Sequence, residues 1–579
     1  MTSNTSIRPA EMQEKTDTDA TTGSKDHLTQ ITSVASTTPS STTTKPPLSK
    51  EGDLDSSTAL ASLPTTSNNS SSDDDDGGGD EALAFLTNHP RRREIFAEAR
   101  AMLEDDATRA ALVRKIDWNI APLLCCVYFL QFLDKNTISY TSVMGMRQDT
   151  HMKGQQYNDI SMLFYASYLV FEFPTQYLAQ RLNRVSLYMG INIMLWGTVL
   201  ACHAAATSFG ALAVLRTLLG VFEACVPPLL VLIVAMWYRK EEQGRRISWF
   251  YVCNSVTKIF GGLVAYGISY VQGALATWRI FFLAIGLATV ATGWAVAVWM
   301  PDSPVQARRF RDAEKVAVLL RIRDNQSGTQ NKHLKKDQVR EAFTDVRVWL
   351  ICLSMMLIAI PNGGIANFNN ILLTTFGYTP RQALLLDAPV GLLSGIFILT
   401  LGHLSDKLND RSTISILCLL PTIAAGFLMF FLVDPQTGHP LSKPLLLLAS
   451  LLSGSYNASF MVLLAWSASN IGGHSKKVTV NALALVCLSL GSMLGTQTFR
   501  ASQKPIYQAG KLSIVVCLLA DCVVLCVLRW CNARLNRRNE KVRRELGVVE
   551  GGVQERREVE RVAWSDLGDR QNVFFRYTK

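Results

Sequence analysis

The chain has 579 residues, of which 48% are hydrophobic and 18% charged, and its formal net charge is +10. A soluble protein of this length carries nearer a quarter of charged residues. The basic residues stand in short segments between long apolar runs, which is typical of membrane proteins and unlike a nucleic-acid-binding groove. The composition therefore argues against a soluble globular protein and favours one that crosses a membrane several times.

Residues 1–110 are rich in Ser, Thr and Asp and include the acidic run Asp73–Asp76 followed by three glycines. Such a segment cannot bury enough apolar area to offset the entropy lost on ordering, so we expect a disordered tail. It contains no secretory signal, and the first membrane span must then act as the targeting signal. Just before that span, Arg109–Asp117 predicts a short amphipathic helix.

Twelve apolar runs are long enough to cross ~30 Å of hydrocarbon at about 1.5 Å per helical residue. They lie at residues 118–140, 157–180, 187–206, 210–237, 248–271, 279–300, 347–370, 383–403, 412–433, 443–467, 478–499 and 512–530. The fifth contains Lys258, and Pro361–Gly364 is expected to break the seventh. The fold class is therefore an all-α membrane protein with twelve transmembrane helices.

Basic residues follow the even-numbered spans, and this predicts which side of the membrane each loop occupies. They are Arg181 and Arg184, Arg239–Arg246, the long segment 301–346, Lys407 with Arg411, and Lys476 with Lys477. Both termini are therefore expected in the cytoplasm. The predicted parts are a tail (1–110), an N-terminal half (111–300), a cytoplasmic central loop (301–346), a C-terminal half (347–531) and a cytoplasmic C-terminal tail (532–579).

A short internal repeat supports the division into two six-helix halves. Leu178–Asn183 after the second span matches Leu404–Asn409 after the eighth, at an offset of 226 residues. The first and seventh spans begin about 229 residues apart, so the match falls in the register that a duplication predicts. Duplicated halves that enclose a site near the membrane midplane are a recurrent transporter plan.

The fourth span carries two charges, Arg216 and Glu223. Seven residues at ~100° per residue bring them back to nearly the same helix face. A charge in hydrocarbon costs several kcal/mol unless it faces a partner, water or the bundle interior. We expect this face to look onto a polar cavity; the alternative is a salt-bridged packing helix whose charges only hold the bundle together.

Several motifs resemble the major facilitator superfamily, and specifically the fungal anion:cation symporter family of allantoate, nicotinate, pantothenate and other carboxylate permeases. The motifs are Arg114–Asp117, Phe132–Thr137, Phe171–Pro174, Leu215–Ala224, Trp237–Arg239, Gly402–Arg411, Ala465–Lys477, Ser565–Asp569 and Phe575–Tyr577. The resemblance covers residues 110–579 and implies a transporter with two six-helix halves. The chain departs from the family at Lys258 and Asp387, where small or neutral residues are expected, and at Gln180, where an acidic residue is usual.

Carboxylate substrates need a cation near the midplane of the membrane. A guanidinium forms bidentate pairs with carboxylates, so Arg216 is the first candidate for binding a substrate or coupling carboxylate. The family resemblance also suggests a role for Arg216 in proton relay. Lys258 is the second candidate; its alternatives are snorkelling to the membrane surface or pairing with a protein carboxylate.

Proton coupling needs a carboxyl group that gains and loses a proton during the transport cycle. Glu172, Glu223, Asp134 and Asp387 qualify by position, and Glu172 and Glu223 are the better relay candidates. Asp134 beside Lys135 has a structural ion pair as its alternative. Asp387 could instead pair with Lys258.

Other polar residues are candidates for gating or for lining the pathway. Asp406, Lys407 and Arg411 lie in an expected loop, where charge pairs can latch one conformation. Asn362, Asn367, Asn369 and Asn370 either line the cavity or belong to an ordinary helix end. The 12 cysteines lie almost entirely in apolar runs without a CxxC pair, and His403 and His474 have no ligand spacing. We expect no disulfide, no metal and no cofactor, with a proton as the coupling ion.

The preferred function is proton-coupled uptake of a small organic anion across the plasma membrane by a monomer that binds no nucleic acid. The alternatives are export of a secondary metabolite or drug, and a nutrient receptor that does not transport. The segment Gly261–Gly267 lacks the proline usual in drug:proton antiporters of the superfamily, which disfavours export. No nucleotide loop, nucleophile motif or metal constellation indicates an enzyme.

Overall fold

Helices make up all the regular secondary structure of the residues that the computed structural model describes, which are 91–182, 184–323, 335–408, 410–434, 437–545, 568–570 and 572–578. The first part of the chain forms α4 (Arg92–Glu104), α5 (Asp106–Val143), α6 (Met146–Asp149), α7 (Gln156–Arg181), α8 (Val185–Cys202), α9 (Phe209–Glu223), α10 (Val226–Trp237), α11 (Lys240–Ile268) and α12 (Thr277–Trp299). Two helices, α13 (Asp312–Arg323) and α14 (Lys336–Thr344), lie between the halves in sequence. The remainder forms α15 (Val346–Thr375), α16 (Pro380–Leu408), α17 (Arg411–Phe431), α18 (Lys443–Leu452), α19 (Tyr456–Asn470), α20 (His474–Thr498) and α21 (Gln508–Glu545).

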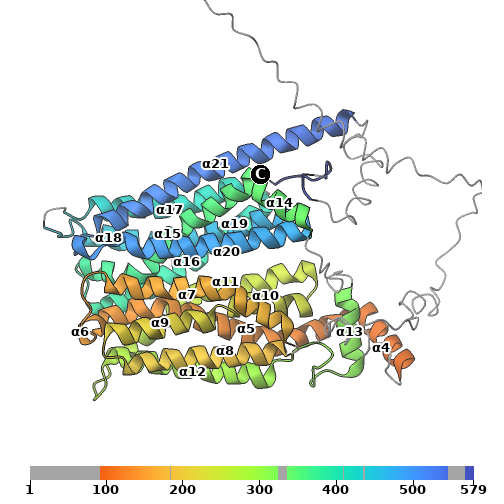
Figure 1. Cartoon of the computed structure of the whole chain (residues 1–579), viewed down its shortest axis with the longest axis horizontal. Helices are drawn as coiled ribbons and strands as arrows, with labels where there is room; N and C mark the ends of the chain where they lie inside the picture. The colour runs from red at the N-terminus through yellow and green to blue at the C-terminus, as the bar shows by residue number, and fades with distance from the viewer. Residues whose placement is uncertain are drawn as a thin grey trace, which may run out of the picture. The chain divides into compact units, whose positions relative to one another are not determined.

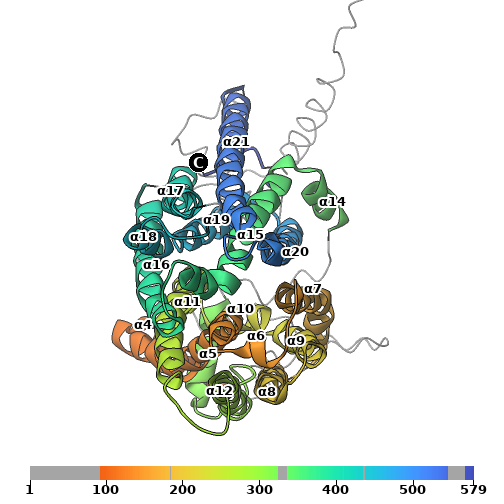
Figure 2. The same ribbon diagram turned by 90° about the vertical axis from the view of Figure 1, so that its left-hand side faces the viewer.

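The long helices form two groups that run side by side in Figure 1. Helices α5 and α7–α12 form the N-terminal half, and α15–α21 form the C-terminal half. We call the end where α5 and α15 begin the tail end, and the end where α7 begins and α15 finishes the far end. Figure 2 shows the bundle from its far end, with α11 of one half next to α16 of the other.

Ten helical stretches are long and apolar enough to cross a membrane, and Val252–Ile268 of α11 is a shorter apolar helix. Each of the twelve predicted runs coincides with one of these stretches or with α7. Helix α7 is not among the ten, but it packs against α9 and α20 within the bundle. The predicted all-α membrane fold is thereby confirmed.

The predicted disorder of residues 1–110 is wrong for its last part, because residues 92–104 form α4 and α5 begins at Asp106. Asp105 caps α5 by accepting hydrogen bonds from Ala107 N at 3.3 Å and Thr108 N at 3.1 Å. The predicted amphipathic helix is therefore the start of α5 and is continuous with the first span. Residues 1–90 lie outside the described residues.

The predicted break in the seventh span is also wrong, because α15 is continuous through Pro361. The glycines that suggested a break serve close packing instead. A Cβ added to Gly363 would lie 2.2 Å from Ser492 O of α20, and one added to Gly495 of α20 would lie 2.0 Å from Ile360 O. Contacts between small residues let helices approach closely in lipid, where no hydrophobic force drives them together.

Two spans that the sequence predicted as single helices are divided in the structure. The fourth span consists of α9 and α10, which meet just before Pro227 and Pro228. The tenth consists of α18 and α19, separated by Ser453–Ser455. The eighth span is instead longer than predicted, because α16 continues to Leu408 and no residue in its last turns breaks a helix.

The predicted central loop (301–346) contains two helices that pack on different halves. Helix α13 packs against α4, and its Glu314 accepts a hydrogen bond from Lys115 Nζ of α5 at 2.6 Å. Arg321 of α13 also pairs with Glu242 of α11. Helix α14 packs against α20 of the C-terminal half. The predicted C-terminal tail (532–579) likewise contains structure, since α21 extends to Glu545 and residues 568–578 lie against the C-terminal half.

Candidate functional site

Two consecutive residues of α5, Asp134 and Lys135, face two charged residues of α9. Asp134 Oδ1 lies 3.8 Å from Arg216 Nη1, and Lys135 Nζ lies 3.5 Å from Glu223 Oε1. Arg216 and Glu223 are 3% and 0% exposed, which agrees with the prediction that one face of the fourth span carries both charges inward. Asp134 and Lys135 do not simply pair with each other, because each has a partner on α9.

A third carboxylate, Glu172 of α7, joins this cluster. It is buried one helical turn after Tyr168, whose ring centre lies 5.6 Å from Lys135 Nζ. Neither carboxylate oxygen of Glu172 or of Glu223 has a hydrogen-bond partner among the described residues. The structure therefore brings four of the six predicted binding or coupling residues into one buried group, and adds Lys135.

Two aromatic residues complete the group and were missed by sequence reasoning. Trp196 of α8 donates a hydrogen bond from Nε1 to Asp134 Oδ2 at 2.6 Å. The guanidinium of Arg216 lies 5.9 Å from the ring centre of Phe282 in α12, within cation–π range. Both aromatic residues lie in predominantly apolar runs, where the sequence does not distinguish them from lipid-facing or core side chains.

A second buried group lies at the contact between the two halves. Asp387 of α16 accepts hydrogen bonds from Tyr140 OH of α5 at 2.6 Å and from Asn369 Nδ2 of α15 at 2.9 Å. Lys258 of α11 is buried nearby, because it packs against Gly391, which follows Asp387 by one turn of α16. No described carboxylate comes within 4.0 Å of the Lys258 ammonium, so the pair predicted from the sequence is a neighbouring charge rather than a direct ion pair.

Small residues bring α11 and α16 together at this group. A Cβ added to Gly391 would lie 2.7 Å from Lys258 Cβ and 2.8 Å from Ser255 O. A Cβ added to Gly262 would lie 2.7 Å from Leu384 O. The glycines therefore set the distance between the backbones that carry Lys258 and Asp387.

The predicted asparagines of the seventh span lie inside the bundle and hold helices together. Asn367 and Asn370 contact the N-terminal half: Asn367 Oδ1 accepts from Ser161 Oγ at 3.1 Å, and Asn370 Nδ2 donates to Ser139 Oγ at 3.1 Å. Asn362 Oδ1 accepts from Tyr456 OH at 2.9 Å within the C-terminal half. These contacts do not fit an ordinary helix end at the outer surface, which was one of the two roles predicted for the asparagines.

The predicted gating residues are not in a loop. Asp406 and Lys407 belong to the last turns of α16, and Lys407 is exposed. Arg411 begins α17 and donates to Ser469 Oγ of α19 at 2.9 Å and to the carbonyl of Ala465. These bonds of Arg411 stay within the C-terminal half. A gating role for Asp406, Lys407 and Arg411, through charge pairs that hold one conformation, remains a prediction.

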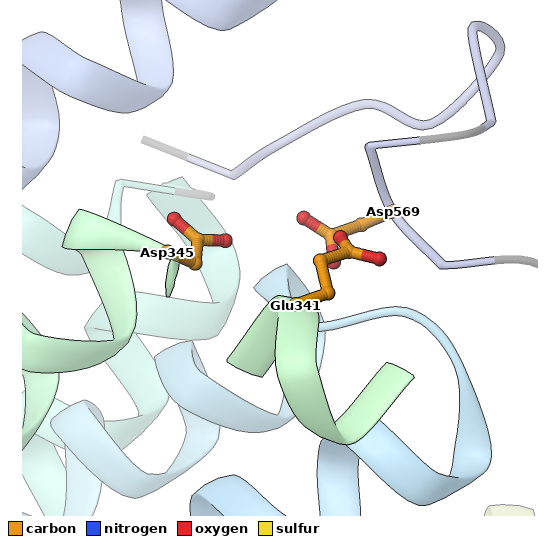
Figure 3. Close-up of side chains that lie close together, drawn as sticks. All are labelled: Glu341, Asp345 and Asp569. Atoms are coloured by element: carbon orange, nitrogen blue, oxygen red, sulfur yellow. The ribbon is translucent and has the colours of Figure 1, made fainter. Parts of the chain in front are cut away.

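At the tail end, three carboxylates from separate segments converge on one lysine. Figure 3 shows Glu341 of α14, Asp345 at the start of α15 and Asp569 of the C-terminal segment. Lys476 Nζ donates to one oxygen of each, at 2.9, 2.9 and 2.6 Å respectively. Carboxylate clusters can hold metal ions, but here the ammonium lies at the position a metal would need. The sequence prediction included neither Lys476 nor Asp569 among the site residues.

The protonation of Asp345 reflects these partners. Burial alone would raise the pKa of this carboxyl group, but the hydrogen bonds and charge of Arg347, together with Lys476, outweigh burial. The pKa of Asp345 is therefore held well below its usual range, and the group is ionised at neutral pH.

Comparison with known proteins shows what this arrangement resembles. Residues 124–496 match the Major Facilitator Superfamily. The chain is 35% identical to the allantoate permease of Saccharomyces cerevisiae, over 80% of this chain and 85% of the permease. It is 31% identical to a thiamine pathway transporter of the same yeast, over 80% of this chain and 86% of that protein.

Solved structures share the fold at low sequence identity. A bacterial homologue of the human lysosomal transporter Spinster, in an inward-facing and occupied conformation, aligns with a TM-score of 0.52 at 16% identity, covering 71% of this chain and 94% of the homologue. A D-xylose–proton symporter aligns with a TM-score of 0.51 at 14% identity, covering 70% of this chain and 97% of the symporter.

Proposed function

This chain belongs to the Major Facilitator Superfamily, and we propose that it takes up a small organic carboxylate together with a proton by alternating access. Its family and its relatives are transporters, so this chain is a multi-pass membrane transporter and not an enzyme. What we propose is a proton as the coupling ion, a carboxylate as the substrate and uptake as the direction of transport.

The observation that carries the proposal is that α5 contributes to both buried groups. Asp134 and Lys135 belong to the first group, and Tyr140 to the second. Six residues at about 1.5 Å each separate Asp134 from Tyr140, which is about 9 Å along the helix axis. A small shift of α5 would therefore act on both groups at once, as coupled transport requires.

The first group is suited to holding a proton because its charges do not balance. Asp134, Glu172 and Glu223 supply three carboxylates, whereas Lys135 and Arg216 supply two cations. An uncompensated charge in a low-dielectric interior is costly. One proton shared by these carboxylates makes the group neutral, and Glu172 and Glu223 are suited to accept it because neither of their oxygens has a hydrogen-bond partner among the described residues.

The second group is suited to holding an anion. Both oxygens of Asp387 accept hydrogen bonds from neutral groups, and no described carboxylate lies within 4.0 Å of the Lys258 ammonium. A substrate carboxylate can supply that partner, and the second N–H of the Asn369 amide can donate to a polar group of the substrate. This favours Lys258 over Arg216 as the substrate cation, because Arg216 is already engaged with Asp134.

The relatives support a carboxylate as substrate. The yeast relative at 35% identity is named an allantoate permease, and allantoate is a small carboxylate with polar amide groups. Because Lys258 departs from this family, the relative supports a small carboxylate as the substrate class rather than allantoate itself.

We place the protein in the plasma membrane with its tail end in the cytoplasm. The tail end carries many basic side chains, among them Arg184, Arg246, Arg308 and Lys476, as expected for a cytoplasmic surface. The two halves are joined at the far end by hydrogen bonds such as that from Tyr157 OH to Asn367 O at 2.7 Å. We therefore assign the described conformation to a state closed toward the outside.

Uptake of radiolabelled allantoate, nicotinate, pantothenate and biotin into cells that lack their own permeases tests the proposal. We expect one of these compounds to accumulate, and a protonophore to abolish its accumulation. If no compound enters despite surface expression, export or sensing becomes the better hypothesis.

Two variants then separate the roles of the two groups. Glu223→Gln should abolish accumulation but leave exchange of internal for external substrate intact, because exchange needs no net proton movement. Lys258→Ala should abolish both accumulation and exchange. Asp106→Asn is the control, because the Asp106 side chain is 85% exposed at the tail end. Normal accumulation by Glu223→Gln would refute the coupling role.

A further inference from the structure

The last residues of the chain return to the tail end of the C-terminal half. Residues 568–578, of which all but 571 are described, form a segment that we call the C-terminal strap. Its residues contact α15, α19, α20 and α21, and Figure 1 marks the chain end next to α21. In sequence the strap is separated from the end of α21 by residues 546–567.

Asparagine side chains bind the backbone of the strap. Asn536 of α21 donates from Nδ2 to Tyr577 O at 2.8 Å and accepts from Tyr577 N at 2.9 Å. Asn470 of α19 accepts from Thr578 N at 2.7 Å and donates to Thr578 O at 3.4 Å. A side-chain amide offers the same donor and acceptor as a peptide group, so each asparagine reproduces the contacts of a neighbouring β-strand.

Further contacts extend this recognition along the strap. Asn539 Nδ2 of α21 donates to Phe575 O at 3.2 Å, and Asn532 Nδ2 donates to Thr578 O at 3.2 Å. Trp466 Nε1 of α19 also donates to Thr578 O, at 3.0 Å. The three asparagines of α21 are spaced at four and three residues, which places them on one face of the helix. This face binds an extended peptide through its main chain.

Two side chains of the strap fill specific positions. Asp569 is buried and accepts from Lys476 Nζ at 2.6 Å and from Arg347 of α15. Tyr577 is buried, donates from its hydroxyl to Asp569 Oδ2 at 3.1 Å, and lies under the Arg347 guanidinium at 4.4 Å from the ring centre. The site therefore selects an acidic residue and a tyrosine eight positions apart.

Asp569 also completes the bonding of Lys476, which is 0% exposed. An ammonium has three donors, and the three partners of Lys476 are Glu341, Asp345 and Asp569. Without the strap, a buried ammonium and a buried guanidinium would each lose a carboxylate partner. Loss of such a partner destabilises the fold, because it leaves a buried charge without compensation.

From these contacts we propose that the tail end of the C-terminal half is a peptide-binding site whose ligand is the chain's own C-terminal strap, bound reversibly. When it is bound, the strap holds the tail ends of α15, α19, α20 and α21 together. When it leaves, these ends lose their common partner and the half is less stable. This inference does not depend on the substrate or coupling ion of the transporter.

The chain's own strap is the preferred occupant because it is covalently attached. Attachment through residues 546–567 gives the strap an effective concentration in the millimolar range, which a free peptide in the cell does not reach. The site must therefore be tested after the attachment has been cut, so that a peptide in solution can compete.

The experiment uses the full chain with a protease recognition sequence placed within residues 546–567. The protein folds with the strap in place and is cut after purification in detergent. A fluorescent synthetic peptide of residues 567–579 is then added, and its binding is followed by anisotropy. We expect saturable binding to the cut protein and none to the uncut protein, and a lower unfolding temperature for cut, washed protein that the peptide restores.

Variants test the two kinds of contact. A peptide with Asp569→Asn should bind about tenfold or more weakly, because it loses charge-assisted hydrogen bonds. Asn536→Ala in the protein should weaken binding by a similar factor, whereas Asn119→Ala, at the tail end of the other half, should not change it. The proposal is overturned if the strap never leaves the cut protein, if the peptide fails to bind after it leaves, or if cut and uncut proteins bind it equally.

Discussion

Asp134 is the residue that links most of the first buried group, because Trp196 donates to one of its carboxylate oxygens and Arg216 lies beside the other. The spacing of Arg216 and Glu223 predicts that both face the interior, and both are buried. Their partners could not be predicted, because Asp134 and Lys135 reach them only when α5 packs beside α9. Trp196 and Lys476 were missed for the same reason: their importance arises from residues distant in sequence.

Trp196→Phe should lower both stability and transport. The substitution removes the hydrogen bond to Asp134 and leaves a buried carboxylate oxygen without its donor. A hydrogen bond to a charged group contributes about 2 kcal/mol, so the free energy of unfolding in detergent should fall by about that amount. Trp294→Phe is the matched control, since Trp294 is exposed on the surface of the bundle and should change stability little.

Asp345→Asn should destabilise the protein in a pH-dependent way. Because the pKa of Asp345 is lowered in the folded state, its carboxylate stabilises the fold above the ordinary aspartate pKa of about 4, and this contribution is lost as the pH falls toward the folded pKa. The difference in unfolding free energy between the unaltered chain and the variant should be about 3 kcal/mol at pH 7. Below pH 4 it should narrow by about 1.4 kcal/mol per pH unit.

Chemical unfolding in detergent at a series of pH values measures this difference. Asp312→Asn is the control, because Asp312 is half exposed on α13. A difference that stays constant down to pH 3 would show that the charge of Asp345 is not what stabilises the tail end.

Among the helices, the sequence predicts location well and continuity less well. The twelve apolar runs all coincide with helices because length and hydropathy are properties of each segment alone. Pro361 and its glycines suggested a break, yet α15 is continuous and its glycines lie where α20 packs closely against it. Whether a glycine ends a helix or allows another helix to pack closely depends on which helix lies beside it, and a single sequence does not reveal that.

The contact between α11 and α16 gives a test at the level of helices. Gly391→Ala places a Cβ about 2.7 Å from Lys258 Cβ and 2.8 Å from Ser255 O, so the helices must separate. We expect a loss of about 1–3 kcal/mol of stability and reduced uptake, because the position of Lys258 also changes. Gly402→Ala on the same helix meets nothing within 4 Å and should be neutral or stabilising in the same unfolding and uptake assays.

In the whole molecule, hydrogen bonds across the far end hold the two halves in the described arrangement. Asn158 Nδ2 of α7 donates to Thr496 O at 2.7 Å and to Phe499 O at 2.8 Å. Gln155 Oε1 accepts from Ala501 N at 2.8 Å. These bonds must break if the halves separate at the far end, so they set the balance between conformations.

Asn158→Ala should shift that balance toward an arrangement open at the far end. Two hydrogen bonds contribute about 2 kcal/mol together, which corresponds to a change of about 30-fold in the ratio of the two conformations. Spin labels at the exposed residues Lys153 and Ser502, in a background without reactive cysteines, should report a new population at longer distance. Asn192→Ala, which removes a bond within α8, should leave the distance distribution unchanged.

Helix α13 packs with the N-terminal half and α14 with the C-terminal half, which determines the residues that connect the two halves along the chain. Each half keeps its own part of the central segment, through Glu314 and Arg321 on one side and Glu341 on the other. Along the chain, residues 324–334 connect these two parts, and a segment of that length spans at most about 40 Å. A chain cleaved between residues 324 and 334 would still give two fragments, and each described helix would stay with the half against which it packs.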